Sequence, residues 1–293
     1  MMTFKIVLTV CLFLMIKPVL AAEDNIKMIR DLAYGSSPLQ TMDVYLPANA
    51  KDAPILLLIH GGAWQFGDKR STGLIKNKVN RWVKKGFILV SANYRLVPEV
   101  DPITQAKDIA AAIYTIQTQA EQWQGDADKM MILGHSAGAH LLALLTSHQT
   151  LMQEVNIRPW LASFIIDSQA LDLVTLMQQK HVEFYDKAFG KQEHYWQQAS
   201  PINYVNGNEI PMFVVCSLQR EYACDSSARF VNTLHQVGSQ AELLQLDLTH
   251  DETLEDIGLN NTYTQTIENY MSALHPEIKN RLIHSDKKNP PTP

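Results

Sequence analysis

A serine flanked by glycines is the residue whose setting most clearly predicts chemistry. Ser136 stands in the string Gly134-His-Ser-Ala-Gly138, which follows an apolar run ending at Leu133 and precedes a segment of helical character. A serine on a tight turn between a strand and a helix presents its hydroxyl as a nucleophile, and the glycines let the strand and the helix approach closely. The spacing therefore predicts acyl transfer through Ser136.

An earlier pair of glycines predicts the groups that such a nucleophile needs. The string His60-Gly-Gly-Ala-Trp64 directly follows a buried apolar run. Attack on a carbonyl creates an oxyanion, which backbone N–H groups stabilise when they are already held in position. We expect the N–H groups of Gly62, Ala63 and Ala137 to form this oxyanion hole, and we expect His60 to brace the loop.

The general base is expected at His250. This residue follows the last apolar run of the chain, where the order serine, acid, histidine requires the base to fall. The other histidines lie in helical, cap or tail segments, or belong to the turn and helix around Ser136. The sequence therefore assigns proton transfer to His250.

The acid that orients the histidine is harder to place. It should leave the apolar run 212–216 and precede the next helix, and both Glu221 and Asp225 lie there. A carboxylate holds the imidazole in the right tautomer and stabilises its cation, and either Glu or Asp serves if the loop has room. Glu221 is ranked first, Asp225 second, and Asp167, at the end of an earlier apolar run, third.

The elements that position these residues alternate along the chain. A continuous apolar run at 54–59 is typical of a strand buried on both faces, and further strands are expected at 87–92, 130–133, 161–166, 212–216 and 243–248. Helical stretches separate them at about 73–85, 103–123, 138–147, 225–237 and 260–273. With an early antiparallel strand at 39–48, this order predicts an α/β fold with a mostly parallel, twisted sheet and helices on both faces.

One catalytic domain over residues 23–276 accounts for this alternation. Residues 168–210 are too long for a plain connection and are expected to form a small cap insertion. Its aromatic residues Tyr185 and Trp196, together with Trp64, are candidates for substrate contacts. The tail 277–293 is expected to be disordered.

The N-terminal segment predicts export. Lys5 precedes an apolar run over residues 6–16, and small residues follow up to Ala22, which is the layout of a cleaved signal peptide over residues 1–22. The run falls short of the roughly 20 apolar residues that span a bilayer, so no stable membrane anchor is expected. The mature protein is therefore expected to be secreted or periplasmic.

Cysteine content and charge limit the other functions. In an oxidising compartment Cys216 and Cys224 are expected to form a disulfide, with two buried reduced thiols as the alternative. The formal net charge of −5 does not favour nucleic-acid binding. No cluster of Cys and His has metal-ligand spacing, so neither a metal nor a cofactor is expected, and the expected partner is a small-molecule ester. The oligomeric state is left open.

The chain resembles the α/β-hydrolase superfamily of esterases and lipases over most of residues 38–273. It is similar to the branches that contain hormone-sensitive-lipase-like and bacterial feruloyl-esterase-like enzymes and kynurenine formamidases. The matching strings are His60-Gly-Gly-Ala-Trp64, Gly67-Asp-Lys69, Asn93-Tyr-Arg-Leu96, Asp108, Gly134-His-Ser-Ala-Gly138 and His250.

This resemblance implies a serine carboxylesterase that acts on small to medium esters through an acyl-enzyme. The chain departs from the family pattern at Ala63, where many relatives carry a third glycine, and at Glu221, where the acid is usually Asp. Two alternatives remain. The same site could serve an arylformamidase or another amidase, or the fold could belong to a catalytically silent binding protein.

Overall fold

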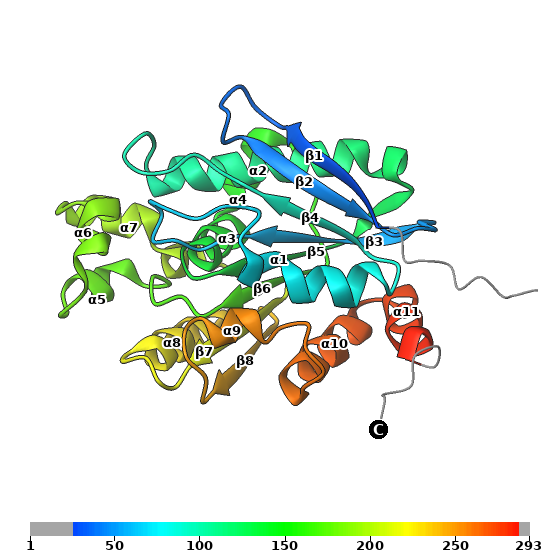
Figure 1. Cartoon of the computed structure of the whole chain (residues 1–293). Helices are drawn as coiled ribbons and strands as arrows, with labels where there is room; N and C mark the ends of the chain where they lie inside the picture. Colours follow the sequence, from blue (N-terminus) through cyan, green and yellow to red (C-terminus); the bar gives the residue numbers. More distant parts are fainter. Residues whose placement is uncertain (1–25, 287–293) are drawn as a thin grey trace, which may run out of the picture.

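A twisted sheet of eight strands runs through the computed structural model, which describes residues 26–286 (Figure 1). Its strand order is β1-β2-β4-β3-β5-β6-β7-β8. The strands are β1 (Lys27–Ala33), β2 (Thr41–Leu46), β3 (Ala53–Ile59), β4 (Ile88–Ala92), β5 (Gly125–His135), β6 (Ala162–Ile166), β7 (Met212–Ser217) and β8 (Ala241–Leu246). β2 pairs antiparallel with β1 and β4, whereas the remaining pairs are parallel. The predicted signal peptide lies outside the described residues.

Helices cover both faces of this sheet (Figure 1). They are α1 (Thr72–Lys78), η1 (Val79–Val83), α2 (Pro102–Gln119), η2 (Ala120–Trp123), α3 (Ala137–Ser147), α4 (Gln149–Val155), α5 (Leu173–Met177), α6 (Glu183–Phe189), α7 (Glu193–Ala199), η3 (Pro201–Tyr204), α8 (Ala223–Gln236), α9 (Glu252–Glu255), α10 (Thr262–Leu274) and α11 (Pro276–Asp286). The predicted α/β class is therefore confirmed.

The central strand β3 shows why these elements form. All seven of its side chains are buried, and they alternate between two cores. Ile55, Leu57 and Ile59 pack with α2, α3 and α8, whereas Leu56 and Leu58 pack with α1, α10 and α11. A strand that is covered on both faces therefore reads as an unbroken apolar run.

The C-terminal segment is ordered where disorder was predicted. α11 covers residues that were assigned to a disordered tail, and its Ile278 and Leu282 are buried in the core beside Ile267 and Met271 of α10. Residues four apart lie on one face of a helix, so this pair anchors α11. The prediction for 277–293 is therefore wrong up to residue 286, and residues 287–293 lie outside the description.

The segment between β6 and β7 forms a small cap. It contains α5, α6, α7 and η3, and Figure 1 shows α5, α6 and α7 together beyond the carboxyl end of β3. Tyr185 and Phe189 of α6 are buried against the ring of Trp64, which lies on the loop after β3. The cap is thus packed onto the loop that was predicted to form the oxyanion hole.

The two cysteines of the described chain are joined. Cys216 in β7 and Cys224 in α8 form a disulfide with their Cα atoms 5.2 Å apart, as the sequence predicted. The bridge closes the short loop between β7 and α8, which lies at the carboxyl ends of the parallel strands.

Candidate active site

Ser136 occupies a strained turn between β5 and α3. Its φ of 55° is in the left-handed region that non-glycine residues rarely adopt. A Cβ at Gly134 would lie 2.4 Å from the carbonyl oxygen of Gly138, and a Cβ at Gly138 would lie 2.4 Å from that of His60. The glycines therefore allow the contacts of strand, helix and oxyanion loop that hold the serine in this conformation.

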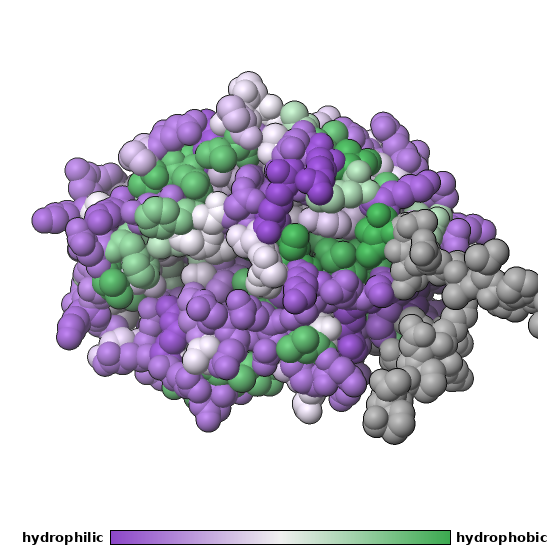
Figure 2. Space-filling model, viewed as in Figure 1, coloured by the Kyte–Doolittle hydropathy of each residue, from purple (hydrophilic) through white to green (hydrophobic). Residues whose placement is uncertain are grey.

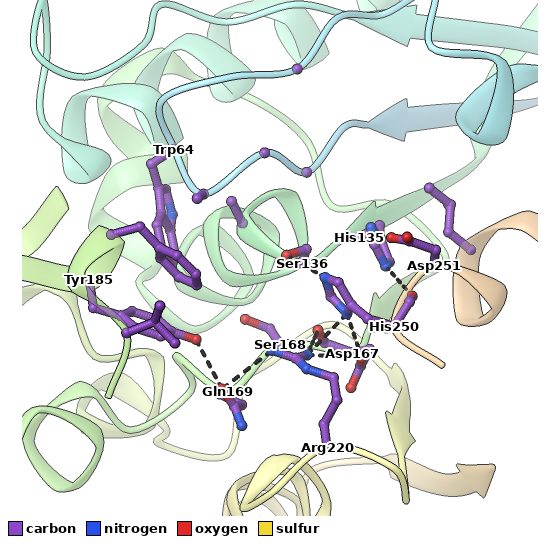
Figure 3. Close-up of a pocket in the computed structure, with 18 of the residues that line it drawn as sticks. Trp64, His135, Ser136, Asp167, Ser168, Gln169, Tyr185, Arg220, His250 and Asp251 are labelled. Carbon is purple, nitrogen blue, oxygen red and sulfur yellow. Dashed lines mark hydrogen bonds and ion pairs between the residues drawn. The ribbon is translucent and has the colours of Figure 1, made fainter. Parts of the chain in front are cut away.

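The side chains of Ser136, His250 and Asp167 follow separate strands and lie in contact with one another in this order (Figure 3). The Oγ of Ser136 lies 3.0 Å from Nε2 of His250, and Nδ1 of His250 lies 2.6 Å from Oδ2 of Asp167. Ser136 follows β5, Asp167 follows β6, and His250 follows β8. This is the geometry of a nucleophile, a base and an orienting acid.

Asp167 is fully buried, and its carboxylate accepts three hydrogen bonds from other residues. Its Oδ1 accepts from the backbone N–H of Ser217 at 3.0 Å, and its Oδ2 accepts from Arg220 at 2.9 Å as well as from His250. Burial alone raises the pKa of a carboxyl, but these donors and the charge of Arg220 outweigh it and lower the pKa of Asp167 to about 2. The carboxylate is therefore ionised at neutral pH.

The predicted acid is corrected by this geometry. Glu221, ranked first, and Asp225, ranked second, are not bonded to His250. Glu221 accepts a hydrogen bond at its backbone oxygen from Gln169, while its carboxylate interacts with the hydroxyl of Tyr222. Asp225 lies in the first turn of α8. The loop after β7 brings Arg220 to the histidine, and the carboxylate that His250 contacts is that of Asp167, which follows the neighbouring strand β6.

The loop after β3 carries three consecutive residues with positive φ. They are Gly62 at 120°, Ala63 at 50° and Trp64 at 62°. The side chain of Gln105 and the backbone N–H of Val97 both donate to the carbonyl oxygen of Trp64, at 2.8 and 3.0 Å. These bonds stabilise a loop conformation that is costly for alanine and tryptophan.

The predicted oxyanion donors are free to bind a ligand. Among the described residues, no acceptor is bonded to the backbone N–H groups of Gly62, Ala63 or Ala137. Gly62 and Ala63 line the same cleft as Ser136, as does Ala137 at the start of α3. Unpaired N–H groups beside a nucleophile can stabilise an oxyanion.

Two buried histidines brace the site. His60 stacks on Tyr94 with ring centroids 4.4 Å apart, and burial lowers its pKa to about 4. His135 donates from Nε2 to the carbonyl oxygen of His250 at 3.0 Å and lies against its ring (Figure 3). Burial and the neighbouring His250 lower the pKa of His135 to about 3, so this ring is neutral at pH 7.

The cleft above Ser136 has a volume of about 650 Å³. Of the predicted substrate contacts, Trp64 and Tyr185 line it, and the Tyr185 hydroxyl donates to Oε1 of Gln169 at 3.2 Å (Figure 3). Trp196 is not among the lining residues, and its indole N–H donates to the carbonyl oxygen of Gly190 within the cap. A substrate contact at Trp196 stays a prediction.

Sequence reasoning missed two residues of this site. Arg220 and Gln169 both line the cleft, and Arg220 Nη2 donates to Gln169 at 3.3 Å. Nothing in the local sequence marks either residue, because each acts through a partner that is distant along the chain. Arg220 does lie shortly after β7, but in this loop the sequence predicts an acid and not a cation.

Residues 26–286 contain neither a metal-ligand cluster nor a helix that could span a membrane. No three His, Cys, Asp or Glu side chains in this range are grouped so that they could hold a metal ion. In the same range no helix combines the length and the apolar composition needed to cross a bilayer.

On the face viewed in Figure 2, apolar side chains form separate patches between hydrophilic ones.

The known proteins that the chain resembles include a formamidase and a methylesterase. A family model described as BD-FAE matches residues 42–222, which include Ser136 and Asp167. The kynurenine formamidase of Danio rerio is 29% identical over 147 residues, covering 49% of this chain and 48% of the fish protein. A probable isoprenylcysteine alpha-carbonyl methylesterase of Arabidopsis thaliana is 26% identical over 235 residues, covering 73% of this chain and 49% of the plant protein. The chain thus spans about half the length of these relatives.

Solved structures share the fold. A truncated carbohydrate esterase from gut microbiota has a TM-score of 0.73 at 18% identity, covering 86% of this chain and 98% of its own. Esterase B from Lactobacillus Rhamnosis has a TM-score of 0.67 at 19% identity, covering 90% and 88%. At such low identity the likeness establishes the architecture alone.

Proposed function

The chain belongs to the BD-FAE family of α/β-hydrolases, and on this premise we propose that it is a serine carboxylesterase that hydrolyses small to medium carboxylic esters. The observation that carries the proposal is the line of hydrogen bonds from Ser136 to His250 to Asp167 at one wall of the cleft. The names of its relatives, esterases and formamidases, agree with this reaction class.

Acylation begins with proton transfer. As the Oγ of Ser136 bonds to the ester carbonyl carbon, Nε2 of His250 accepts the hydroxyl proton. The ionised Asp167 holds the Nδ1–H of the ring and stabilises the imidazolium that forms. The tetrahedral oxyanion accepts hydrogen bonds from the N–H groups of Gly62, Ala63 and Ala137.

The remaining steps return the site to its starting state. The oxyanion collapses, the bond to the alcohol oxygen breaks, and His250 gives its proton to the departing alcohol. Water then attacks the acyl-enzyme while His250 accepts one of its protons. When the second tetrahedral intermediate collapses, Ser136 recovers that proton and the carboxylic acid leaves.

The cleft supports a limit on substrate size. Its volume of about 650 Å³ falls within the range of small-molecule sites, and buried Trp64 and Tyr185 form part of its wall. We expect esters of short and medium acyl chains to react best. Each further methylene contributes about 0.8 kcal/mol only where an apolar surface receives it.

The test is labelling and turnover of the purified protein. We expect a fluorophosphonate probe to label the wild type, and p-nitrophenyl butyrate to be hydrolysed faster than long-chain esters. Ser136→Ala should lose both labelling and turnover while keeping the wild-type circular dichroism spectrum, since one hydroxyl contributes little packing. Turnover near the wild-type rate in Ser136→Ala would contradict the proposal.

An arylformamidase is the second candidate. It is favoured by the match to the kynurenine formamidase of Danio rerio. Comparing kcat/KM for an N-formyl arylamine with that for an aryl ester of the same ring decides between the two reactions. A catalytically silent binding protein, the candidate from another class, would show neither labelling nor turnover.

We also propose that the protein is exported. The proposal is supported by the pattern of residues 1–22 and by the Cys216–Cys224 disulfide, because such bonds persist in oxidising compartments. N-terminal sequencing of protein recovered outside the cytoplasm should begin at Ala22 or Glu23.

A further inference from the structure

Arg220 is bonded to the acid of the site and lies beside its base. Its Nη1 donates to Oδ2 of Asp167 at 2.9 Å and to the backbone oxygen of Asp167 at 3.0 Å. The same nitrogen lies 3.1 Å from Nδ1 of His250. Figure 3 shows the guanidinium next to both partners.

The contact with His250 brings two donors together. Both Nη1 of Arg220 and Nδ1 of His250 point at Oδ2 of Asp167, and a guanidinium has no acceptor to offer the ring. A positive charge so close disfavours a second one on the imidazole, because like charges disfavour the charged form of a neighbour. Arg220 thus offsets the stabilisation of the imidazolium that Asp167 alone would provide.

The other groups around His250 do not replace this charge. His135 packs against the ring but is neutral at pH 7, since burial and His250 lower its pKa to about 3. Asp251, next in the chain, also lines the cleft. The charge of Lys78 is near enough to lower the pKa of His135. Arg220 is the one cation among the described residues that is hydrogen-bonded to Asp167.

The position of Arg220 is restrained by its loop and by a chain of hydrogen bonds that leads to the cap. Its loop is closed by the Cys216–Cys224 disulfide, and its second terminal nitrogen donates to Gln169. Gln169 in turn accepts from the hydroxyl of buried Tyr185 in the cap. A side chain fixed at both ends of its guanidinium is suited to set the geometry of its neighbours.

We propose that Arg220 is a positioning residue that holds Asp167 against His250 and keeps His250 unprotonated, and therefore active as a base, down to a lower pH than the Asp–His pair alone would allow. This inference rests on the proposed roles of His250 and Asp167. It concerns the pH range of the reaction rather than its chemistry.

The experiment compares charge removal at Arg220 with the same change elsewhere. The pH dependence of kcat/KM for p-nitrophenyl butyrate is measured for the wild type, Arg220→Met, Arg220→Gln and Arg220→Lys. The control is Arg158→Met, which removes an exposed arginine paired with Asp128, near the start of β5 and so at the opposite end of that strand from Ser136. In parallel, the imidazole signals of His250 are followed against pH by NMR.

In Arg220→Met and Arg220→Gln, we expect the acidic limb of the profile and the change in the His250 signals to move upward by about one pH unit. Arg220→Lys keeps the charge, and Arg158→Met removes a distant one. In both variants the acidic limb and the His250 signals should change at the same pH as in the wild type. An unmoved limb and unmoved signals in the uncharged variants would overturn the inference. A wild type without turnover, whose His250 signals still move on charge removal, would refute the proposed esterase while leaving the role of Arg220 standing.

Discussion

At the scale of single residues, environment decides which carboxylate can act. Asp167 is buried, bonded to His250 and held at a pKa of about 2, whereas the carboxylate of Glu221 interacts with Tyr222. Both side chains line the same cleft, so proximity to the cleft alone does not distinguish them. Contact with the imidazole of His250, which only Asp167 makes, distinguishes the two carboxylates.

The acid can be tested by two isosteric changes. Asp167→Asn should lower kcat by about 10⁴, because an amide cannot hold His250 in the right tautomer or offset its charge. Glu221→Gln is the matched control and should keep kcat within about threefold, since its carboxylate does not contact His250. Steady-state kinetics on one aryl ester measures both. A greater loss in Glu221→Gln than in Asp167→Asn would return the role to the loop after β7.

At the scale of elements, the packing of β3, β5 and α3 determines where the serine lies. Gly138 belongs to α3, where alanine would ordinarily favour the helix by about 1 kcal/mol. A Cβ at Gly138 would, however, lie 2.4 Å from the carbonyl oxygen of His60, which is rigid backbone. Close packing therefore opposes the usual preference.

Gly138→Ala should lower the free energy of unfolding by at least about 2 kcal/mol, as overpacking does in a rigid core. The control is Gly73→Ala in α1, where the new Cβ would meet the flexible side chain of Glu255. Urea unfolding of both variants gives the comparison. Equal stability of the two variants would show that the oxyanion loop yields to the added methyl group.

The anchoring of α11 is a second property at this scale. Ile278 is fully buried, whereas Ile283 in the same helix is 45% exposed. Ile278→Ala should cost about 2–4 kcal/mol of unfolding free energy, because it removes buried methyl groups and leaves a cavity. Ile283→Ala should cost less than about 0.5 kcal/mol. If the two variants unfold at the same denaturant concentration, α11 does not contribute to the core.

At the scale of the whole molecule, three neutral buried histidines link stability to pH. Burial lowers the pKa values of His60 and His140 to about 4 and that of His135 to about 3. His140 is tied into its setting, since Nδ1 accepts from the indole of Trp64 and Nε2 donates to the carbonyl oxygen of Ala199. Protonating it would place a donor against a donor.

The sign of this dependence follows from proton uptake. Below pH 6.5 the unfolded chain binds protons at these histidines while the folded chain does not, so the free energy of unfolding falls as pH decreases from 6.5 toward 4. Each histidine contributes up to about 1.4 kcal/mol per pH unit in this window. Urea unfolding at pH 7.5, 6.5 and 5.5 should show this fall in the free energy of unfolding. His140→Gln should reduce the slope of that free energy against pH by the contribution of one bound proton. Constant stability across this range would contradict the neutral state of the three rings.

The sequence by itself determined the α/β class and the places of Ser136 and His250. Ser136 follows a continuous apolar run and lies between glycines that only a tight turn explains, and His250 follows the last predicted strand at 243–248. Such signals are local, because a buried strand and the turn after it are encoded by neighbouring residues. Local signals also existed for α11 in the pair Ile278 and Leu282, but they were too few to be recognised without α10 beside them.

Only the tertiary structure decided which carboxylate contacts His250 and which cation contacts that carboxylate. The ends of β6 and β7 lie at the same edge of the sheet, so a carboxylate after either strand could in principle reach His250. The loop that the disulfide closes turns Arg220 toward the site and Glu221 toward Tyr222, while Asp167 points from β6 to the imidazole. These contacts join residues that are distant along the chain, and their direction depends on how strands and loops pack, which no local pattern encodes.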